Sequence, residues 1–201
     1  SVGVFLCLKK TKKVFFSFHY QDVIDFRANV VRKHGSFKLS SQDAGFYDSS
    51  MWEKAKKESA LALKKLINNG LQNTSNTCVL IGTETYLRPW VRYELLKSVK
   101  KGNHIFGVHI NSIPCKNKEI KPLGKNPLDY VGLFAKDNDS YHLIQKKNDG
   151  KWYYYQEIDG TSEVKVKHSL KLNANLPLSQ FYSSYYWTND KGYDNFKNWV
   201  K

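Results

Sequence analysis

A continuous apolar run followed by a helix that starts at a proline constrains the fold of this chain most. The run is Thr77-Cys78-Val79-Leu80-Ile81-Gly82, and an unbroken apolar segment is typical of a strand in a parallel sheet covered on both faces. Pro89 suits the first turn of a helix, where its missing N–H costs nothing, and Gly102-Asn103 predicts the end of that helix after Lys100 or Lys101. Ligands of open α/β sheets bind beyond the carboxyl ends of the strands. The segment between this strand and this helix is therefore the first place to look for a site.

The neighbouring segments continue the alternation of strands and helices. The sequence predicts an aromatic strand over Lys13–Phe18, a loop over His19–Asp22, and a helix over Val23–His34 that ends at Gly35 and places Ile24, Val30 and Val31 in the core. A short strand near Phe46-Tyr47 follows, and then a helix that begins with the capping pair Ser50 and Glu53 and ends at Asn68-Asn69-Gly70. A further strand is predicted over His104–Ile110. The second of these helices presents one apolar face, made of Ala55, Ser59, Ala62, Leu63, Leu66 and Ile67. This order predicts an α/β fold with a flavodoxin-like parallel sheet and helices on both faces.

The pattern changes after Asn111. Prolines and glycines punctuate an irregular stretch, and then two β-rich runs, 141–145 and 151–155, flank Asn148-Asp149-Gly150, which predicts a late β-hairpin. Helical spacing of apolar residues from Asp190 to Val200 predicts a C-terminal helix that packs on the sheet. We expect residues 1–11 to be an N-terminal extension or an expression remnant, with an extra edge strand as an alternative. Residues 12–201 are then one domain, in which 114–176 form a β-rich insertion or appendage.

Composition limits the partners and the setting. The net charge of +14 attracts anions, which leaves nucleic acid, a dinucleotide and an acidic protein as candidates, but the lysines are scattered and favour a solvated surface over a nucleic-acid site. The three cysteines, Cys7, Cys78 and Cys115, lack metal-ligand spacing and indicate a reducing, cytoplasmic setting without a bound metal. No apolar run approaches the roughly 18 residues of a membrane-spanning helix.

This sequence lacks the motifs of other nucleotide-binding or signalling folds that have a similar sheet. A flavodoxin needs a Ser/Thr/Gly-rich phosphate loop after the first strand, where this chain has His19-Tyr20-Gln21. A response-regulator receiver needs clustered acidic residues at the end of that strand, and Phe15-Phe16-Ser17-Phe18 has none. A dinucleotide-binding Rossmann enzyme needs G-x-G-x-x-G after a strand, which is also missing.

Three segments together resemble a known family. They are VFFSFHYQD at 14–22, TCVLIGTETYLRPWVRYELLKSV at 77–99 and GYDNFKNWV at 192–200. They look like the TIR-like subunit ThsB of the Thoeris anti-phage defence system, a branch of the TIR domains, in which a Trp precedes a Glu on the third helix. The resemblance covers nearly all of residues 12–201 and implies a TIR-like fold.

The resemblance implies an NAD-consuming enzyme. It would release nicotinamide and make a cyclic ADP-ribose isomer, which acts as a second messenger for a separate effector protein. The catalytic glutamate of the family matches Glu94, and the residues matching its nucleotide cleft are Phe18, His19, Tyr20, Gly82, Thr83 and Trp90. NAD is then the substrate and no cofactor is expected. The expected partners are NAD, the effector reached through the diffusible product, and further copies of the chain in a homo-oligomer, but neither nucleic acid nor a membrane.

The residues themselves fit this chemistry. Nicotinamide leaves NAD as a neutral molecule and needs no general acid, so one carboxylate that stabilises the positive charge developing on the ribose suffices. Glu84 is a minor rival to Glu94 for that role, and Arg88 and Arg92 are either ligands of a pyrophosphate or solvated charges. Without the resemblance, Glu94 would be a solvated helix residue, Phe18 and Trp90 core aromatics, and His19 a loop residue without a role. A different class of protein, a non-catalytic TIR-like interaction module with or without a basic nucleic-acid-binding surface, stays open as the alternative.

Overall fold

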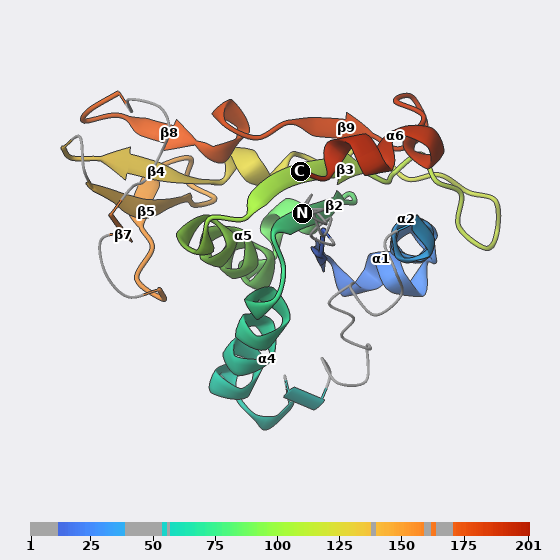
Figure 1. Cartoon of the computed structure of the whole chain (residues 1–201), viewed down its shortest axis with the longest axis horizontal. Coiled ribbons are helices and arrows are strands. Elements are labelled where there is room, and N and C mark those ends of the chain that lie inside the picture. Colours follow the sequence, from blue (N-terminus) through green and yellow to red (C-terminus); the bar gives the residue numbers. More distant parts are fainter. Residues whose placement is uncertain (1–11, 39–53, 56, 138–139, 159–161, 164–170) are drawn as a thin grey trace, which may run out of the picture.

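The fold is built around a four-stranded parallel sheet, seen in a computed structural model that describes residues 12–38, 54–55, 57–137, 140–158, 162–163 and 171–201 (Figure 1). Its strands lie in the order β1-β2-β3-β9 and have the bounds β1 Val14–Phe18, β2 Asn76–Ile81, β3 His104–His109 and β9 Ser184–Tyr186. All neighbours pair in parallel. The predicted parallel sheet is confirmed, while β9, only three residues long, was not anticipated.

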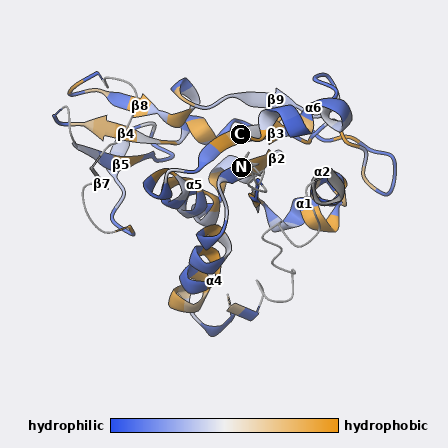
Figure 2. Ribbon diagram, in the orientation of Figure 1, coloured by the Kyte–Doolittle hydropathy of each residue, from blue (hydrophilic) through white to orange (hydrophobic). Residues whose placement is uncertain are grey.

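Helices cover both faces of this sheet. One face carries α4 (Ala60–Gln72) and α5 (Pro89–Lys101), which pack over Phe15, Val79 and Ile105. The other carries α1 (Tyr20–Ile24), α2 (Arg27–Lys38) and α6 (Gly192–Trp199), which enclose a second core cluster. The strands are buried from both sides, which explains why β2 is an unbroken apolar run (Figure 2).

The late part of the chain forms a second, antiparallel sheet beside the first (left in Figure 1). Its path is β6-β5-β4-β8, with β7 paired to β5, and its strands are β4 Val131–Ala135, β5 Ser140–Lys146, β6 Trp152–Tyr154, β7 Ser162–Glu163 and β8 Asn175–Pro177. The predicted hairpin is confirmed, because β5 and β6 pair antiparallel around Gly150, whose φ of 78° suits glycine. Core residues of β4 and β5 pack in the same cluster as α5, so this helix contacts both sheets.

The first predicted helix differs from the structure in its start, its continuity, its end and one expected core residue. The expected loop over His19–Asp22 is short, because α1 begins at Tyr20. The helix is interrupted between α1 and α2 at Phe26, whose φ is 66°. The second part, α2, continues through Gly35 to Lys38. The buried Arg27 explains the break: it donates hydrogen bonds to the Ile113 and Glu119 carbonyls at 2.9 and 2.8 Å and pairs with Asp25. Ile24, expected in the core, is 49% exposed.

The second predicted helix also differs at its described boundaries. Ser59 is not a residue of its apolar face but the N-cap of α4, because its hydroxyl accepts a hydrogen bond from the Ala62 N–H at 3.0 Å. The helix continues past Asn68-Asn69-Gly70 to Gln72, since burial of Leu71 outweighs the weak helix propensity of that triplet. The strand near Phe46-Tyr47 and the capping pair Ser50 and Glu53 lie outside the described residues.

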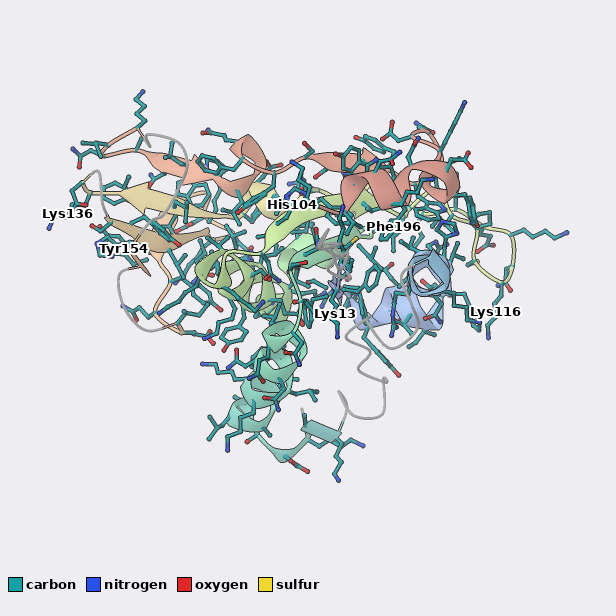
Figure 3. All side chains as sticks on the ribbon, viewed as in Figure 1. Lys13, His104, Lys116, Lys136, Tyr154 and Phe196 are labelled. Atoms are coloured by element: carbon teal, nitrogen blue, oxygen red, sulfur yellow. The ribbon has the colours of Figure 1, made fainter. Side chains whose placement is uncertain are left out.

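The C-terminal helix is confirmed and closes the core. Phe196 of α6, labelled in Figure 3, is fully buried and contacts the rings of Phe16 and Phe106 at centroid distances of 6.1 and 5.8 Å. Figure 3 shows two of the lysines, Lys116 and Lys136, at opposite ends of the molecule. Within the described ranges, no helix has the length and apolar character needed to cross a membrane.

Candidate active site

A cavity of about 340 Å³ opens at the carboxyl ends of β1 and β2. It is lined by the start of α1, by the loop after β2 and by the segment after β3, which contribute His19, Gln21, Asp22, Thr83, Glu84, Lys121 and Pro122. This is the position at which open α/β sheets bind ligands. The structure thus brings His19 and Thr83, both expected at the site, to one cavity.

Asp22 supplies a buried carboxyl group to this cavity. It is 3% exposed, and its Oδ2 has no hydrogen-bond partner among the described residues. Burial raises its pKa from 3.8 to about 6, while the positive charges of Lys121 and Arg27 oppose the shift. A carboxylate held in this way can accept hydrogen bonds from the hydroxyl groups of a bound ligand.

Gly82 lets the carboxyl group of Asp22 approach the end of β2. A Cβ atom at position 82 would collide with both carboxylate oxygens of Asp22. Gly124 also packs closely against Gly82, since a Cβ atom at position 124 would collide with the Gly82 carbonyl oxygen. The Thr83 hydroxyl donates a hydrogen bond to the Pro122 carbonyl at 2.9 Å. The segment around Pro122 therefore covers the end of β2, and Lys121 pairs with Asp25 next to it.

Glu94 lies on the inner face of α5 and is 5% exposed. The hydroxyl of Ser17, in the fully buried middle of β1, donates a hydrogen bond of 2.5 Å to Glu94 Oε2. Burial raises the pKa of Glu94 from 4.5 to about 8, against the opposing effect of the Ser17 hydrogen bond. Without a ligand, Glu94 is therefore mostly a neutral acid at pH 7, and it is not part of the lining given above for the cavity.

A buried polar network fixes the last turns of α5 on the sheet. The Ser98 hydroxyl donates to the Glu94 carbonyl at 2.7 Å and shares a hydrogen bond of 2.8 Å with Thr77. Asn103 donates to the hydroxyls of Thr77 and Thr74 at 3.1 and 3.0 Å. Each member has a partner, so the network holds the helix that carries Glu94 in one position. Asn103 thus lies at the helix end, away from the cavity.

The other expected site residues lie in different surroundings. Phe18 packs on the opposite face of the sheet from Glu94, with the Arg32 guanidinium 4.8 Å from its ring centroid. Tyr20 is half-buried at the start of α1, and Trp90 packs edge-on against Tyr93 at 5.9 Å in the core cluster around α5. Burial, followed by the charge of Arg88, lowers the pKa of His19, which favours a neutral imidazole.

The other charged candidates, Glu84, Arg88 and Arg92, separate as well. Glu84 pairs with Arg88 at the surface, and its side chain is 55% exposed. Arg92 instead is buried and points toward the second sheet, where it donates to Gln145.

Sequence analysis missed Ser17, Asp22 and Lys121. A signal existed for Ser17, because a lone polar residue in a buried aromatic strand needs a partner from the covering helix. Asp22 is the last residue of the predicted loop, and no local pattern indicates that α1 turns its side chain toward Gly82. Lys121 is about one hundred residues from His19 along the chain, and no local pattern links them.

Comparison with known proteins decides the family. A family model described as "Thoeris protein ThsB, TIR-like domain" matches residues 15–114. A protein of Bacillus cereus (strain MSX-D12), named "Putative cyclic ADP-D-ribose synthase ThsB1", is 49% identical over 190 residues, which are 94% of this chain and 98% of that protein. The chain belongs to the ThsB family. The family resemblance and the TIR-like α/β fold expected from the sequence are thereby confirmed.

The candidate site residues lie inside the segment that matches the ThsB family. The match over residues 15–114 includes β1 from Phe15 onward, β2 and α5, so Ser17, Asp22 and Glu94 all fall inside it. No group of three or more His, Cys, Asp or Glu side chains suited to a metal ion occurs in the described part of this ThsB-family chain. The polar side chains that line the cavity in the described structure are those of His19, Gln21, Asp22, Thr83, Glu84 and Lys121.

Proposed function

We propose that this chain is an NAD-consuming enzyme that releases nicotinamide and forms a cyclic ADP-ribose isomer. The product would be a diffusible second messenger that activates a separate effector protein in anti-phage defence. The observation that carries the proposal is the 49% identity, over nearly the whole of both chains, to a protein named as a cyclic ADP-D-ribose synthase. The effector and the assembly of the chain into a homo-oligomer belong to the same proposal.

Glu94 is our candidate for the catalytic group. Cleavage of the nicotinamide–ribose bond builds positive charge on the ribose, and a carboxylate close to that charge stabilises the transition state. A buried carboxylate does so more strongly than a solvated one, because the local dielectric is low. The raised pKa of Glu94 means that the free enzyme must lose a proton to reach this state, so we expect kcat/KM to increase with pH up to about 8.

The cavity at the carboxyl ends of β1 and β2 is our candidate for binding the substrate. Asp22 would accept hydrogen bonds from ribose hydroxyls, and His19 and Thr83 would contribute neutral hydrogen-bonding groups. Lys121 would place a positive charge near the pyrophosphate. Gly82 supports the site by allowing Asp22 to lie against the backbone. Phe18 and Trp90 are partly buried against the two core clusters, which favours a supporting role for both.

Product analysis tests the proposed reaction. Purified protein at high concentration is incubated with NAD, and nicotinamide and the ADP-ribose products are separated by chromatography and identified by mass. Nicotinamide together with a product of the mass of cyclic ADP-ribose is the expected result, and the protein-free filtrate should activate the effector. Free ADP-ribose as the main product would identify a hydrolase instead. Absence of NAD consumption at all protein concentrations would contradict the proposal.

A non-catalytic interaction module is the second candidate, and one observation favours it. Glu94 is buried, hydrogen-bonded to Ser17 and absent from the cavity lining given above, as a structural residue would be. Such a module would bind partners with equal affinity in the wild type and in Glu94→Gln. Binding of nucleic acid to its basic surface would weaken steeply with added salt.

A further inference from the structure

A second cavity, of about 490 Å³, lies between the start of α5 and the β5–β6 hairpin. It is lined by Leu87, Pro89, Arg92, Gln145, Lys147, Asn148, Asp149, Tyr155 and Glu157. None of these residues belongs to the cavity at the strand ends. The side chains of Arg92 and Glu94 also point to different sheets, since Arg92 donates to Gln145 of β5 and Glu94 accepts from Ser17 of β1. This α5–hairpin cavity is therefore separate from the proposed catalytic group.

The guanidinium of Arg92 is poorly satisfied in its present surroundings. Arg92 is 9% exposed, yet its two hydrogen bonds are long, 3.3 Å to Gln145 Oε1 and 3.4 Å to the Tyr86 carbonyl. Among the described residues, its Nε has no hydrogen-bond partner and no carboxylate forms an ion pair with it. A buried cation normally has a carboxylate or another anion beside it, because burial without one is costly. An anionic ligand would supply what the described residues do not.

Other groups around the cavity also favour an anion. The helix α5 begins at its wall with Pro89, and the N-cap Arg88 makes no side-chain hydrogen bond to the first turn. The start of a helix attracts anions through its free N–H groups and its dipole. Lys147 adds a second positive charge and Asn148 an amide donor. Arginine, lysine and a helix start together are suited to a phosphate group.

The two acidic residues of the lining limit the size and charge of the ligand. Asp149 accepts hydrogen bonds from the Tyr153 hydroxyl at 2.6 Å and the Lys151 N–H at 2.9 Å, and Glu157 pairs with Lys64 at 3.3 Å. Both carboxylates are thus held by their own neighbours, but their charge opposes a polyanion such as a nucleic acid or a triphosphate. Leu87 and Tyr155 offer an apolar wall for a ring.

We propose that the α5–hairpin cavity binds the phosphate group of a sugar- or nucleoside-sized phosphomonoester, with the Arg92 guanidinium as its bidentate ligand. Lys147 and the first turn of α5 contribute to the same phosphate. The site does not depend on the proposed reaction with NAD.

Calorimetric titration of the full chain at fixed ionic strength tests this site. The probes are ribose 5-phosphate, inorganic phosphate and unphosphorylated ribose. The wild type should bind both phosphate-bearing probes in a saturable manner and fail to bind ribose, and tighter binding of ribose 5-phosphate than of phosphate would establish contacts to the sugar. Arg92→Gln should weaken binding of ribose 5-phosphate at least about tenfold, because a charged hydrogen-bond pair is lost. Lys147→Gln, at a more exposed position, should weaken it about two- to fivefold.

Two matched variants locate the binding. Arg88→Gln removes a neighbouring arginine that does not line the cavity and should leave affinity within about twofold of the wild type. Asp22→Asn should leave the affinity for inorganic phosphate unchanged, because Asp22 lies in the other cavity. The proposal is overturned if the wild type binds neither phosphate-bearing probe, if Arg92→Gln and Lys147→Gln bind ribose 5-phosphate as the wild type does, or if Asp22→Asn alone abolishes binding of inorganic phosphate. Lys147→Gln keeps the test decisive if Arg92→Gln fails to fold.

Discussion

Replacement of Glu94 by glutamine should make the protein's stability less dependent on pH. Glutamine has nearly the same shape and can still accept the hydrogen bond from Ser17, but it cannot ionise. The folded state holds Glu94 as a neutral acid with a pKa of about 8, raised from 4.5 by burial, so the native protein binds a proton that the unfolded chain has released. Stability from this group is therefore fully present below about pH 4.5 and is lost as the pH rises toward 8.

The size of the effect follows from the two pKa values. Ionisation of the unfolded chain lowers the free energy of unfolding by less than about 1 kcal/mol at pH 5 and by about 3 kcal/mol at pH 7. The wild type should thus lose about 2 to 3 kcal/mol between these two pH values that Glu94→Gln does not lose. For a chain of this length the melting temperatures of the two proteins should then diverge by roughly 5 to 10 °C.

Urea unfolding and thermal melts at pH 5, 6, 7 and 8 measure this difference. Glu58→Gln, at an exposed position, is the matched control and should follow the wild type at every pH. Wild-type and Glu94→Gln curves that stay parallel from pH 5 to pH 8 would refute the reasoning, because they would mean that Glu94 is already ionised in the native protein.

Three further substitutions test the cavity and the core. Asp22→Asn should raise KM for NAD at least about fivefold with a smaller change in kcat, since a ligand-facing carboxylate is lost. An unchanged KM in steady-state kinetics would show that Asp22 does not contact the substrate. Gly82→Ala should destabilise the protein by about 1 to 3 kcal/mol and reduce activity, because the new methyl group collides with the Asp22 carboxylate; a wild-type urea midpoint would show that Asp22 can move away freely. Phe196→Ala should cost about 3 to 5 kcal/mol because this ring is fully buried, whereas Lys197→Ala, at the adjacent exposed position, should change the urea midpoint little.

The sequence predicted the elements whose burial pattern is strong and local. β2 is apolar throughout, and α5 has proline at its start and glycine, with a φ of 82°, just after its end, so both were placed nearly to the residue. The break at Phe26 was not predictable from local preference. It depends on Arg27 reaching the carbonyls of Ile113 and Glu119, more than eighty residues away, and such contacts leave no periodic signal in the chain.

Part of the candidate site could be predicted from the sequence and part could not. Glu94 became a candidate through its spacing from Trp90 and through the family resemblance, but its burial was not predicted. The lone polar residue Ser17 in the aromatic strand signals a partner on a covering helix, yet the sequence does not say which residue of which helix that partner is. The cavity at the strand ends was expected in position from the general rule for open sheets. Its closure by the segment around Pro122 was not, since it depends on the close packing of Gly124 on Gly82.

Turnover of NAD by Glu94→Gln tests the central claim most directly. Wild type, Glu94→Gln and Glu58→Gln are compared at pH 8 by following release of nicotinamide, with the melting temperature of each protein measured in the same buffer. We predict that Glu94→Gln retains its fold and releases less than about one thousandth of the nicotinamide, in line with the loss of an electrostatic catalytic group, while Glu58→Gln matches the wild type. Release of nicotinamide at the wild-type rate by a folded Glu94→Gln protein would contradict the account.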